Sequence, residues 1–327
     1  MAWYEEAVFY HIYPLGLTGA PAKNPYSEPV QRLDTLHPWL EHIKALGCNA
    51  LYIGPLFQSV GHGYETTDYY TLDGRLGTNE TLKRFVRRAH ELGIQVVLDG
   101  VFNHVGRDFF AFRDLLQHRE GSGYTDWFCH VNFQGNNRFG DGLRYDNWGG
   151  DDALVKLNQK NPAVRDYICD VIRFWVSEFD VDGIRLDAAD VLDFDFMKAL
   201  RQVANEVKPD FWLMGEVIHG DYARWANGEM CHSVTNYELN KGLWSGHNDP
   251  RPDPDPKPEP KPDPEPDPEP EPSPEPDPDD HLNYDNLAAY GPLKSYVDRG
   301  VSPDFKMGAA VYVGDFLNKS KMYNVAL

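Results

Sequence analysis

The stretch NPAVRDYICDVIRFWVSEFDVDGIRLDAAD, residues 161–190, contains the pattern that decides the fold. Pro162 suits the first position of a helix, because its missing amide is one that a helix start leaves unpaired anyway. Apolar residues then recur at helical spacing: Val164, Ile168, Val171, Trp175 and Phe179. The apolar run from Val181 to Leu186 follows. The stretch therefore predicts a helix and then a buried strand that ends in charged residues.

The same theme recurs on both sides of this stretch. Further helices are predicted at 36–46, 82–92 and 196–203. Further strands are predicted at 8–13, 50–53, 94–98, 211–214 and, more weakly, 233–237. Alternating helices and strands predict a parallel sheet covered by helices. Residues 105–155, rich in Gly, Asn, Asp and aromatic residues, break the rhythm, and we interpret them as a small subdomain inserted after the third strand.

A proline-rich segment divides the chain. Residues 250–278 carry proline at every even position, which accounts for 15 of the 25 prolines. Proline removes amide donors and fixes φ, so we expect an extended linker over 250–280. This linker separates a domain at 1–249 from residues 281–327, which we interpret as a fragment of a second module, with a strand predicted near its end.

Charge and composition exclude several classes of protein. The linker region from Asp249 to Asp280 holds 13 acidic and 3 basic residues, which is half of the net charge of −20. The remaining acidic surface has no basic stripe, so we expect no nucleic-acid partner. No apolar run is long enough for a membrane span, and no signal peptide begins the chain, so we expect a cytoplasmic protein without a membrane partner. The four cysteines form no CxxC pair, so we expect no zinc site.

Polar residues cluster where the predicted strands end. Asp99 begins the sequence DGVFNH after the third strand, Arg185 and Asp187 close the fourth, and Glu216 closes the fifth. In parallel barrels the carboxyl ends of the strands form the active-site face. A lone Asp at a strand end is more often a helix cap or a turn residue, so the interpretation depends on several such residues at successive strands. Asp187 and Glu216 then belong to adjacent strands, and their carboxyl groups are expected about 5–5.5 Å apart, which suits a retaining glycosidase.

The surroundings of the two carboxylates predict different roles. Arg185 lies two residues before Asp187, so both side chains point to the same side of a strand. A cation there is expected to keep Asp187 ionised, as a nucleophile requires. Glu216 follows four apolar residues, and apolar surroundings are expected to raise the pKa of its carboxyl so that it serves as the acid.

Residues 1–249 resemble glycoside hydrolase family 13, the α-amylase family. The motifs are DGVFNH at 99–104, GIRLDAAD at 183–190 and GEV at 215–217, supported by HGYETTDYY at 62–70. Together these motifs are specific, although none of them is specific alone. The resemblance implies Asp187 as nucleophile and Glu216 as general acid and base.

The resemblance also implies binding residues. Tyr64 would stack under the sugar at the cleavage subsite, and His104, Arg185 and Asp99 would contact that sugar or the nucleophile. Asn103 matches a position that binds structural calcium in many members, so calcium remains open as a ligand, and we expect no other cofactor. Calcium takes several oxygen ligands, and the sequence alone does not assemble a full set.

Two features differ from the family pattern. The fourth family region, typically FVDNHD on the seventh strand, supplies a third catalytic carboxylate and does not occur in the sequence. The linker begins where the barrel would continue. We therefore expect a (β/α)8 TIM barrel of α-amylase type truncated to about six strands. Residues 281–327 weakly resemble the start of a family 10 xylanase.

The sequence predicts a retaining glycoside hydrolase that acts on α-glucosidic bonds of starch-derived oligosaccharides. An inactive truncated module, or a remnant that only binds glucans, stays open as the alternative because the third carboxylate is missing. The preferred glucan, the linkage, and the balance between hydrolysis and transfer are not determined by these motifs.

Overall fold

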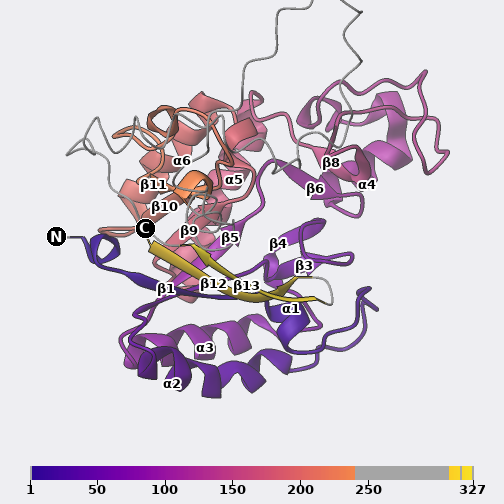
Figure 1. Ribbon diagram of the computed structural model, residues 1–327. Helices are drawn as coiled ribbons and strands as arrows, with labels where there is room; N and C mark the ends of the chain where they lie inside the picture. The colour runs from indigo at the N-terminus through magenta and orange to yellow at the C-terminus, as the bar shows by residue number, and fades with distance from the viewer. Residues whose placement is uncertain (1, 240–308, 317–318, 326–327) are drawn as a thin grey trace, which may run out of the picture. The chain divides into compact units, whose positions relative to one another are not determined.

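The computed structural model describes residues 2–239, 309–316 and 319–325, and Figure 1 shows how their elements are arranged. The main sheet has the strand order β11-β10-β9-β5-β2-β1-β12-β13. Six of these strands pair in parallel and curl into a half-barrel: β1 (Val8–Ile12), β2 (Ala50–Ile53), β5 (Gln95–Gly100), β9 (Gly183–Leu186), β10 (Trp212–Gly215) and β11 (Ser233–Val234). The predicted barrel with about six strands is confirmed. The predicted linker lies outside the described residues.

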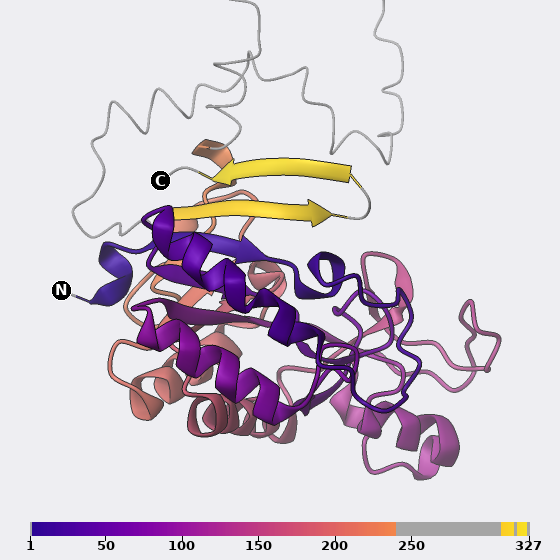
Figure 2. The same ribbon diagram turned by 90° about the horizontal axis from the view of Figure 1, so that it is seen from below.

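Four helices cover the outer face of this sheet (Figures 1 and 2): α2 (His37–Ala45), α3 (Asn79–Glu91), α5 (Pro162–Phe179) and α6 (Phe194–Val207). Local sequence sets where they begin. Thr78 forms a capping box with Thr81 at α3, Asn161 accepts a hydrogen bond from the Ala163 amide at α5, and Asp193 caps α6. The apolar faces of these helices pack on the outward residues of the strands and form the larger of the two cores.

Shorter elements extend the loops at the carboxyl ends of the strands. After α1 (Pro14–Leu17) and β2, the strands β3 (Phe57–Ser59) and β4 (Thr66–Leu72) form a hairpin. Within the predicted insertion, β6 (His104–Gly106), β7 (Asn147–Trp148) and β8 (Asp151–Lys156) form a separate sheet next to α4 (Phe110–His118). Short 3-10 turns complete the described chain at Trp3–Glu5, Arg32–Leu36, Arg119–Gly121, Thr125–Trp127, Ala189–Val191 and Tyr222–Arg224.

The inner face of the half-barrel changes from apolar to polar along the strands. Toward the amino ends of the strands lies the second, smaller core: Ala7, Phe9, Ala50, Tyr52, Val97, Trp212 and Met214. Strand residues alternate between the two faces, so the next inward positions above are polar. His11 pairs in register with Tyr52, and Asp99 pairs with Arg185. Gly183 leaves room for this core, because a Cβ there would lie 2.6 Å from the Trp212 carbonyl oxygen.

Two C-terminal strands extend the sheet beyond β1. β12 (Ala309–Phe316) pairs in parallel with β1 through Val8↔Ala309 and Tyr10↔Val311, and β13 (Lys319–Val325) pairs antiparallel with β12. Figure 2 shows the two strands running beside β1. The sequence assigned residues 281–327 to a second module, whereas the backbone of these two strands continues the barrel sheet.

The predicted boundaries agree with the observed ones, except at β11. The sequence suggested a strand over 233–237, but only Ser233 and Val234 are in one. Residues 237–239 are helical instead, and the Asn236 side chain caps them by accepting a hydrogen bond from the Leu239 amide. Among the described residues, no helix is long and apolar enough to cross a lipid bilayer.

Candidate active site

The predicted site residues lie at the carboxyl ends of neighbouring strands. Asp99 and Arg185 lie within β5 and β9, while Asp187 and Glu216 directly follow β9 and β10. The backbone keeps the last two in register, because the Asp187 amide donates to the Gly100 carbonyl and the Glu216 amide donates to the Leu186 carbonyl. Three adjacent strands therefore bring their charged side chains to one place.

Arg185 holds three carboxylates at once. Its Nη1 lies 2.8 Å from Asp99 Oδ1 and 2.8 Å from Asp187 Oδ1, and its Nη2 lies 2.7 Å from Glu216 Oε2. The side chains of Arg185 and Asp187 are only 8% and 10% exposed. One planar guanidinium thus fixes both candidate catalytic carboxylates, and it leaves the cluster with a surplus of negative charge.

The pKa values of Asp187 and Glu216 are shifted in the directions opposite to those expected from the sequence. Burial raises the pKa of Asp187 to about 7, since Asp99 and Glu216 also repel its charge and Arg185 offsets only part of this. Burial also raises the pKa of Glu216, but Arg185 and hydrogen bonds from the Ala188 amide and Tyr237 outweigh it, so the pKa is lowered. The predicted raised pKa of Glu216 is therefore wrong for the ligand-free site.

The reason for this difference is the shared arginine. The sequence places Arg185 beside Asp187, but not beside Glu216, which enters from the next strand. In the folded chain the guanidinium reaches both, and its shorter contact is with Glu216. The two carboxyl groups therefore titrate as a pair in which Asp187 takes up a proton before Glu216.

Two residues below this cluster support Asp99. The Tyr52 hydroxyl donates a hydrogen bond of 2.7 Å to Asp99 Oδ2. The His11 ring stacks on the Tyr52 ring at 4.2 Å with an interplanar angle of 9°. Burial, with a contribution from Arg185, lowers the pKa of His11 to about 3, so the imidazole is neutral at pH 7 and adds no charge to the cluster.

Tyr64 lies in the loop between β3 and β4, and His104 is the first residue of β6. Burial raises the pKa of the Tyr64 phenol, the charges of Asp99 and Asp187 raise it further, and Arg185 offsets part of this rise. His104 is buried, and its ring is parallel to that of Trp148 at 6.3 Å. Burial, helped by His62, lowers the pKa of His104 to about 4, so it is neutral at pH 7 and available for hydrogen bonding.

Asn103 offers only part of a calcium site. Its side-chain nitrogen lies 3.2 Å from His104 Nδ1, and its Oδ1 is buried without a hydrogen-bond partner. Calcium takes about 6–8 oxygen ligands. In the described part of the chain, no group of three or more His, Cys, Asp or Glu side chains is placed to hold a metal. The Asn103 oxygen is only one of the ligands that calcium needs, and calcium stays a prediction.

Sequence reasoning missed two tyrosines of the site. Tyr52 has a signal, because it is two residues after the inward Ala50 and therefore faces the interior. No strand alternation in the sequence indicates where the Tyr237 side chain points, since Tyr237 lies after β11 in a helical turn. Its hydroxyl nevertheless lies 2.9 Å from Glu216 Oε1.

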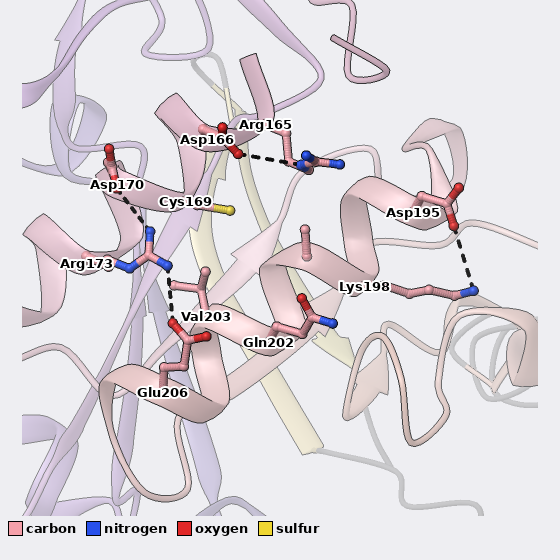
Figure 3. Close-up of a pocket in the computed structure, with 11 residues that line it drawn as sticks. Arg165, Asp166, Cys169, Asp170, Arg173, Asp195, Lys198, Gln202, Val203 and Glu206 are labelled. Carbon is pink, nitrogen blue, oxygen red and sulfur yellow. Dashed lines mark hydrogen bonds and ion pairs between the residues drawn. The ribbon is translucent and has the colours of Figure 1, made fainter. Parts of the chain in front are cut away.

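A surface groove of about 550 Å³ lies between α5 and α6, away from these residues (Figure 3). Its charged lining residues are already paired. Arg173 contacts Asp170 at 3.0 Å and Glu206 at 3.1 Å, and Lys198 contacts Asp195 at 3.8 Å. Such exposed helix-surface pairs are typical of solvated faces, so the groove is not the candidate site.

The comparisons with known proteins agree with this geometry. The model of the α-amylase catalytic domain matches residues 32–251. A cyclomaltodextrinase from Geobacillus thermopakistaniensis is 36% identical over 254 residues, which cover 72% of this chain and 42% of that protein. Neopullulanase 2 from Thermoactinomyces vulgaris is 36% identical over 258 residues, covering 74% and 43%. An intracellular maltogenic amylase from Bacillus subtilis is 34% identical over 205 residues, covering 62% and 34%.

Solved structures give the same result. The ligand-free cyclic α-maltosyl-(1→6)-maltose hydrolase from Arthrobacter globiformis aligns with a TM-score of 0.66 at 30% identity, covering 75% of this chain and 58% of that one. A debranching enzyme from Nostoc punctiforme aligns with a TM-score of 0.64 at 34% identity, covering 73% and 53%. The chain spans less than half the length of the curated relatives named above. The suggested xylanase resemblance of residues 281–327 is not supported by these comparisons.

Proposed function

Because the chain belongs to the α-amylase family, we propose that it is a retaining glycoside hydrolase that cleaves α-glucosidic bonds in starch-derived oligosaccharides. Asp187 is the nucleophile, Glu216 is the general acid and base, and Tyr64, His104, Arg185 and Asp99 bind the sugar or orient the nucleophile. The observation that carries the proposal is the single guanidinium of Arg185, which contacts both Asp187 and Glu216. A shared guanidinium keeps the two carboxylates close to each other, as the spacing of about 5–5.5 Å in retaining enzymes requires.

The reaction has two displacements. Glu216 gives its proton to the glycosidic oxygen while Asp187 attacks C1, so the C–O bond to the leaving sugar breaks and a glycosyl ester forms. Glu216, now ionised, then takes a proton from water. The water oxygen attacks C1, the ester bond breaks, and Asp187 is released as a carboxylate. The product keeps the α configuration because C1 is inverted twice.

The first displacement needs the proton on Glu216, whereas the ligand-free site favours it on Asp187. The substrate is expected to reverse this order. A sugar in the site brings its glycosidic oxygen to Glu216 and displaces the guanidinium from that carboxylate, which leaves Arg185 to Asp99 and Asp187. Without its cation, the buried Glu216 has a higher proton affinity, and Asp187 has a lower one. Arg185 thus changes partner between the resting and the reacting state.

Short or cyclic maltooligosaccharides are the substrates that the relatives support best. The matched proteins are named cyclomaltodextrinase, neopullulanase and maltogenic amylase, and the Bacillus subtilis relative is named intracellular. These names support soluble maltodextrins as substrates and an intracellular location for this protein.

Covalent trapping tests the nucleophile directly. The full chain is incubated with an activated fluoro-α-glucoside that forms a slowly hydrolysed glycosyl-enzyme, and the labelled peptide is identified by mass spectrometry. The label is expected on Asp187. Glu216→Gln should still be labelled because a fluoride leaving group needs no acid, whereas Asp187→Asn should not.

Product stereochemistry tests the double displacement. Proton NMR in the first minutes of maltotriose cleavage should show the α-anomer before mutarotation. A β-anomer formed first would overturn the role of Asp187. Maltotriose binding in calorimetry, with neither label nor cleavage, would favour the glucan-binding alternative instead.

A further inference from the structure

We propose that Tyr237 is a positioning residue for Glu216: its hydroxyl donates a hydrogen bond to Oε1 and fixes the orientation of that carboxylate. The inference rests on the proposed function, in which Glu216 is the acid and base. It assigns a purpose to the segment after β11, which carries none of the family motifs.

The contacts of Glu216 divide between its two oxygens. Oε2 accepts the Ala188 amide at 3.1 Å and contacts Arg185 Nη2 at 2.7 Å. Oε1 accepts the Tyr237 hydroxyl at 2.9 Å. The donors on Oε2 come from the β9 side and the donor on Oε1 comes from the β11 side, so the carboxylate is held from two directions. Arg185 is shared with two other carboxylates, whereas the Tyr237 hydroxyl bonds directly to Glu216 at 2.9 Å.

Hydrogen bonds between the segment after β11 and the residues around Glu216, here called the clamp, place Tyr237 next to Glu216. β11 pairs with β10 through Met214↔Ser233 and Gly215↔Val234. The Thr235 amide then donates to the Gly215 carbonyl at 3.0 Å, and Thr235 Oγ1 accepts the Val217 amide at 3.0 Å. The chain is therefore fixed to the residues on both sides of Glu216, two positions before Tyr237.

This hydrogen bond has a consequence for the chemistry of Glu216. Hydrogen bonds to a carboxylate stabilise its ionised form and so lower its pKa. Burial raises the pKa of Glu216, and the Tyr237 hydroxyl, together with Arg185 and the Ala188 amide, outweighs burial and lowers it. When substrate displaces Arg185, the phenol still holds Oε1, so the carboxylate keeps its direction while it gains the proton.

The titration of Glu216 tests the proposal without requiring turnover. The full chain is labelled with ¹³C at the glutamate carboxyl carbons, and the Glu216 resonance is assigned by its loss in Glu216→Gln. Tyr237→Phe removes only the hydroxyl. We expect the pKa of Glu216 to be higher in Tyr237→Phe than in the unmodified chain, by about one pH unit, as for the loss of one hydrogen bond to a charged group.

Two further variants complete the test. Tyr70→Phe is the control, because it also removes one phenol hydroxyl, from a ring that packs on Tyr167 and Phe174 of α5 away from Glu216, and it should leave the titration of Glu216 unchanged. Thr235→Val keeps the phenol but loosens the clamp, so it should raise the pKa of Glu216 by a smaller amount.

The two possible failures are distinguishable. An unchanged Glu216 titration in Tyr237→Phe, or an equal shift in Tyr70→Phe, would overturn the positioning role, whatever the enzymatic result. Failure of the fluoro-sugar to label Asp187 would overturn the proposed function and leave the hydrogen bond itself measurable.

Discussion

The two ends of strand β9 carry an aspartate each, and the two are in opposite electrostatic situations. Asp182 directly precedes the strand and Asp187 directly follows it. Asp182 Oδ2 lies 2.7 Å from His90 Nε2 and accepts the Val96 amide at 2.8 Å, while Oδ1 accepts Lys208 Nζ at 2.7 Å. Asp187 shares one guanidinium with two other carboxylates.

The pKa values of the two aspartates follow these surroundings. Burial raises the pKa of Asp182, but His90, Lys208 and the Val96 amide outweigh it, so the pKa is below its ordinary value. Burial and two neighbouring carboxylates raise the pKa of Asp187 to about 7. In parallel barrels the amino ends of the strands contribute stability and the carboxyl ends contribute chemistry. At the amino end of β9, the charge of Asp182 is therefore stabilised by its partners. At the carboxyl end, three carboxylates share one arginine, and this excess of negative charge is typical of a reactive site.

The largest expected effect is a loss of activity when the carboxyl end of β9 is changed. Asp187→Asn removes the nucleophile and should lower kcat on maltotriose by about 10⁴-fold or more. Its free energy of unfolding should stay equal or rise, because fewer carboxylates then compete for Arg185. Initial rates and chemical denaturation measure the two quantities, and Asp195→Asn, on the exposed face of α6, is the control. Near-normal turnover in Asp187→Asn would contradict the assignment.

The second largest expected effect is a loss of stability when the amino end of β9 is changed. Asp182→Asn leaves Lys208 and His90 without their buried partner and should reduce the free energy of unfolding by about 2–4 kcal/mol. Asp180→Asn is the matched control, because Asp180 contacts the same Lys208 from a side chain that is 70% exposed, and it should cost less than about 1 kcal/mol. Urea denaturation measures both. Equal losses in the two variants would show that burial does not separate these contacts.

The smallest effect is the pH dependence of stability, which should have opposite signs at the two ends. The folded pKa of Asp187, about 7, exceeds its ordinary 3.8, so its stabilising contribution is present below about pH 4 and is lost as pH rises toward 7. The lowered pKa of Asp182 gives a contribution that is present above about pH 4 and is lost as pH falls through the folded value.

Denaturation at a series of pH values separates the two ends. Asp187→Asn should flatten the decline between pH 4 and 7, because the carboxyl group with the raised pKa is then absent. Asp182→Asn should instead weaken the acid sensitivity below pH 4. A decline between pH 4 and 7 that persists in Asp187→Asn would assign it to other groups.

The order of elements and the main site residues could be predicted from local patterns. Helical and strand periodicities, Pro162 and the apolar run before Arg185 predict the helix and strand of the repeat within a few residues. The charged residues at successive strand ends predict one site, because parallel strands bring their carboxyl ends to the same edge. The hairpin β3–β4 and the continuation of the sheet by β12 were not predicted, since short strands carry too little pattern and sheet neighbours far apart in sequence leave no local signal.

The sequence by itself determined which carboxylates are candidates and which arginine accompanies Asp187, because these depend on residue type and on the two-residue period of a strand. Only the tertiary structure decided how the charges are shared. Arg185 reaches Glu216 across to the next strand, and Tyr237 reaches it from beyond β11. The pKa of a buried group depends on every charge and donor within a few ångströms, whatever their distance along the chain. That sum exists only after folding, which is why the sequence predicted candidate roles for the two carboxylates but not the order in which they take up a proton.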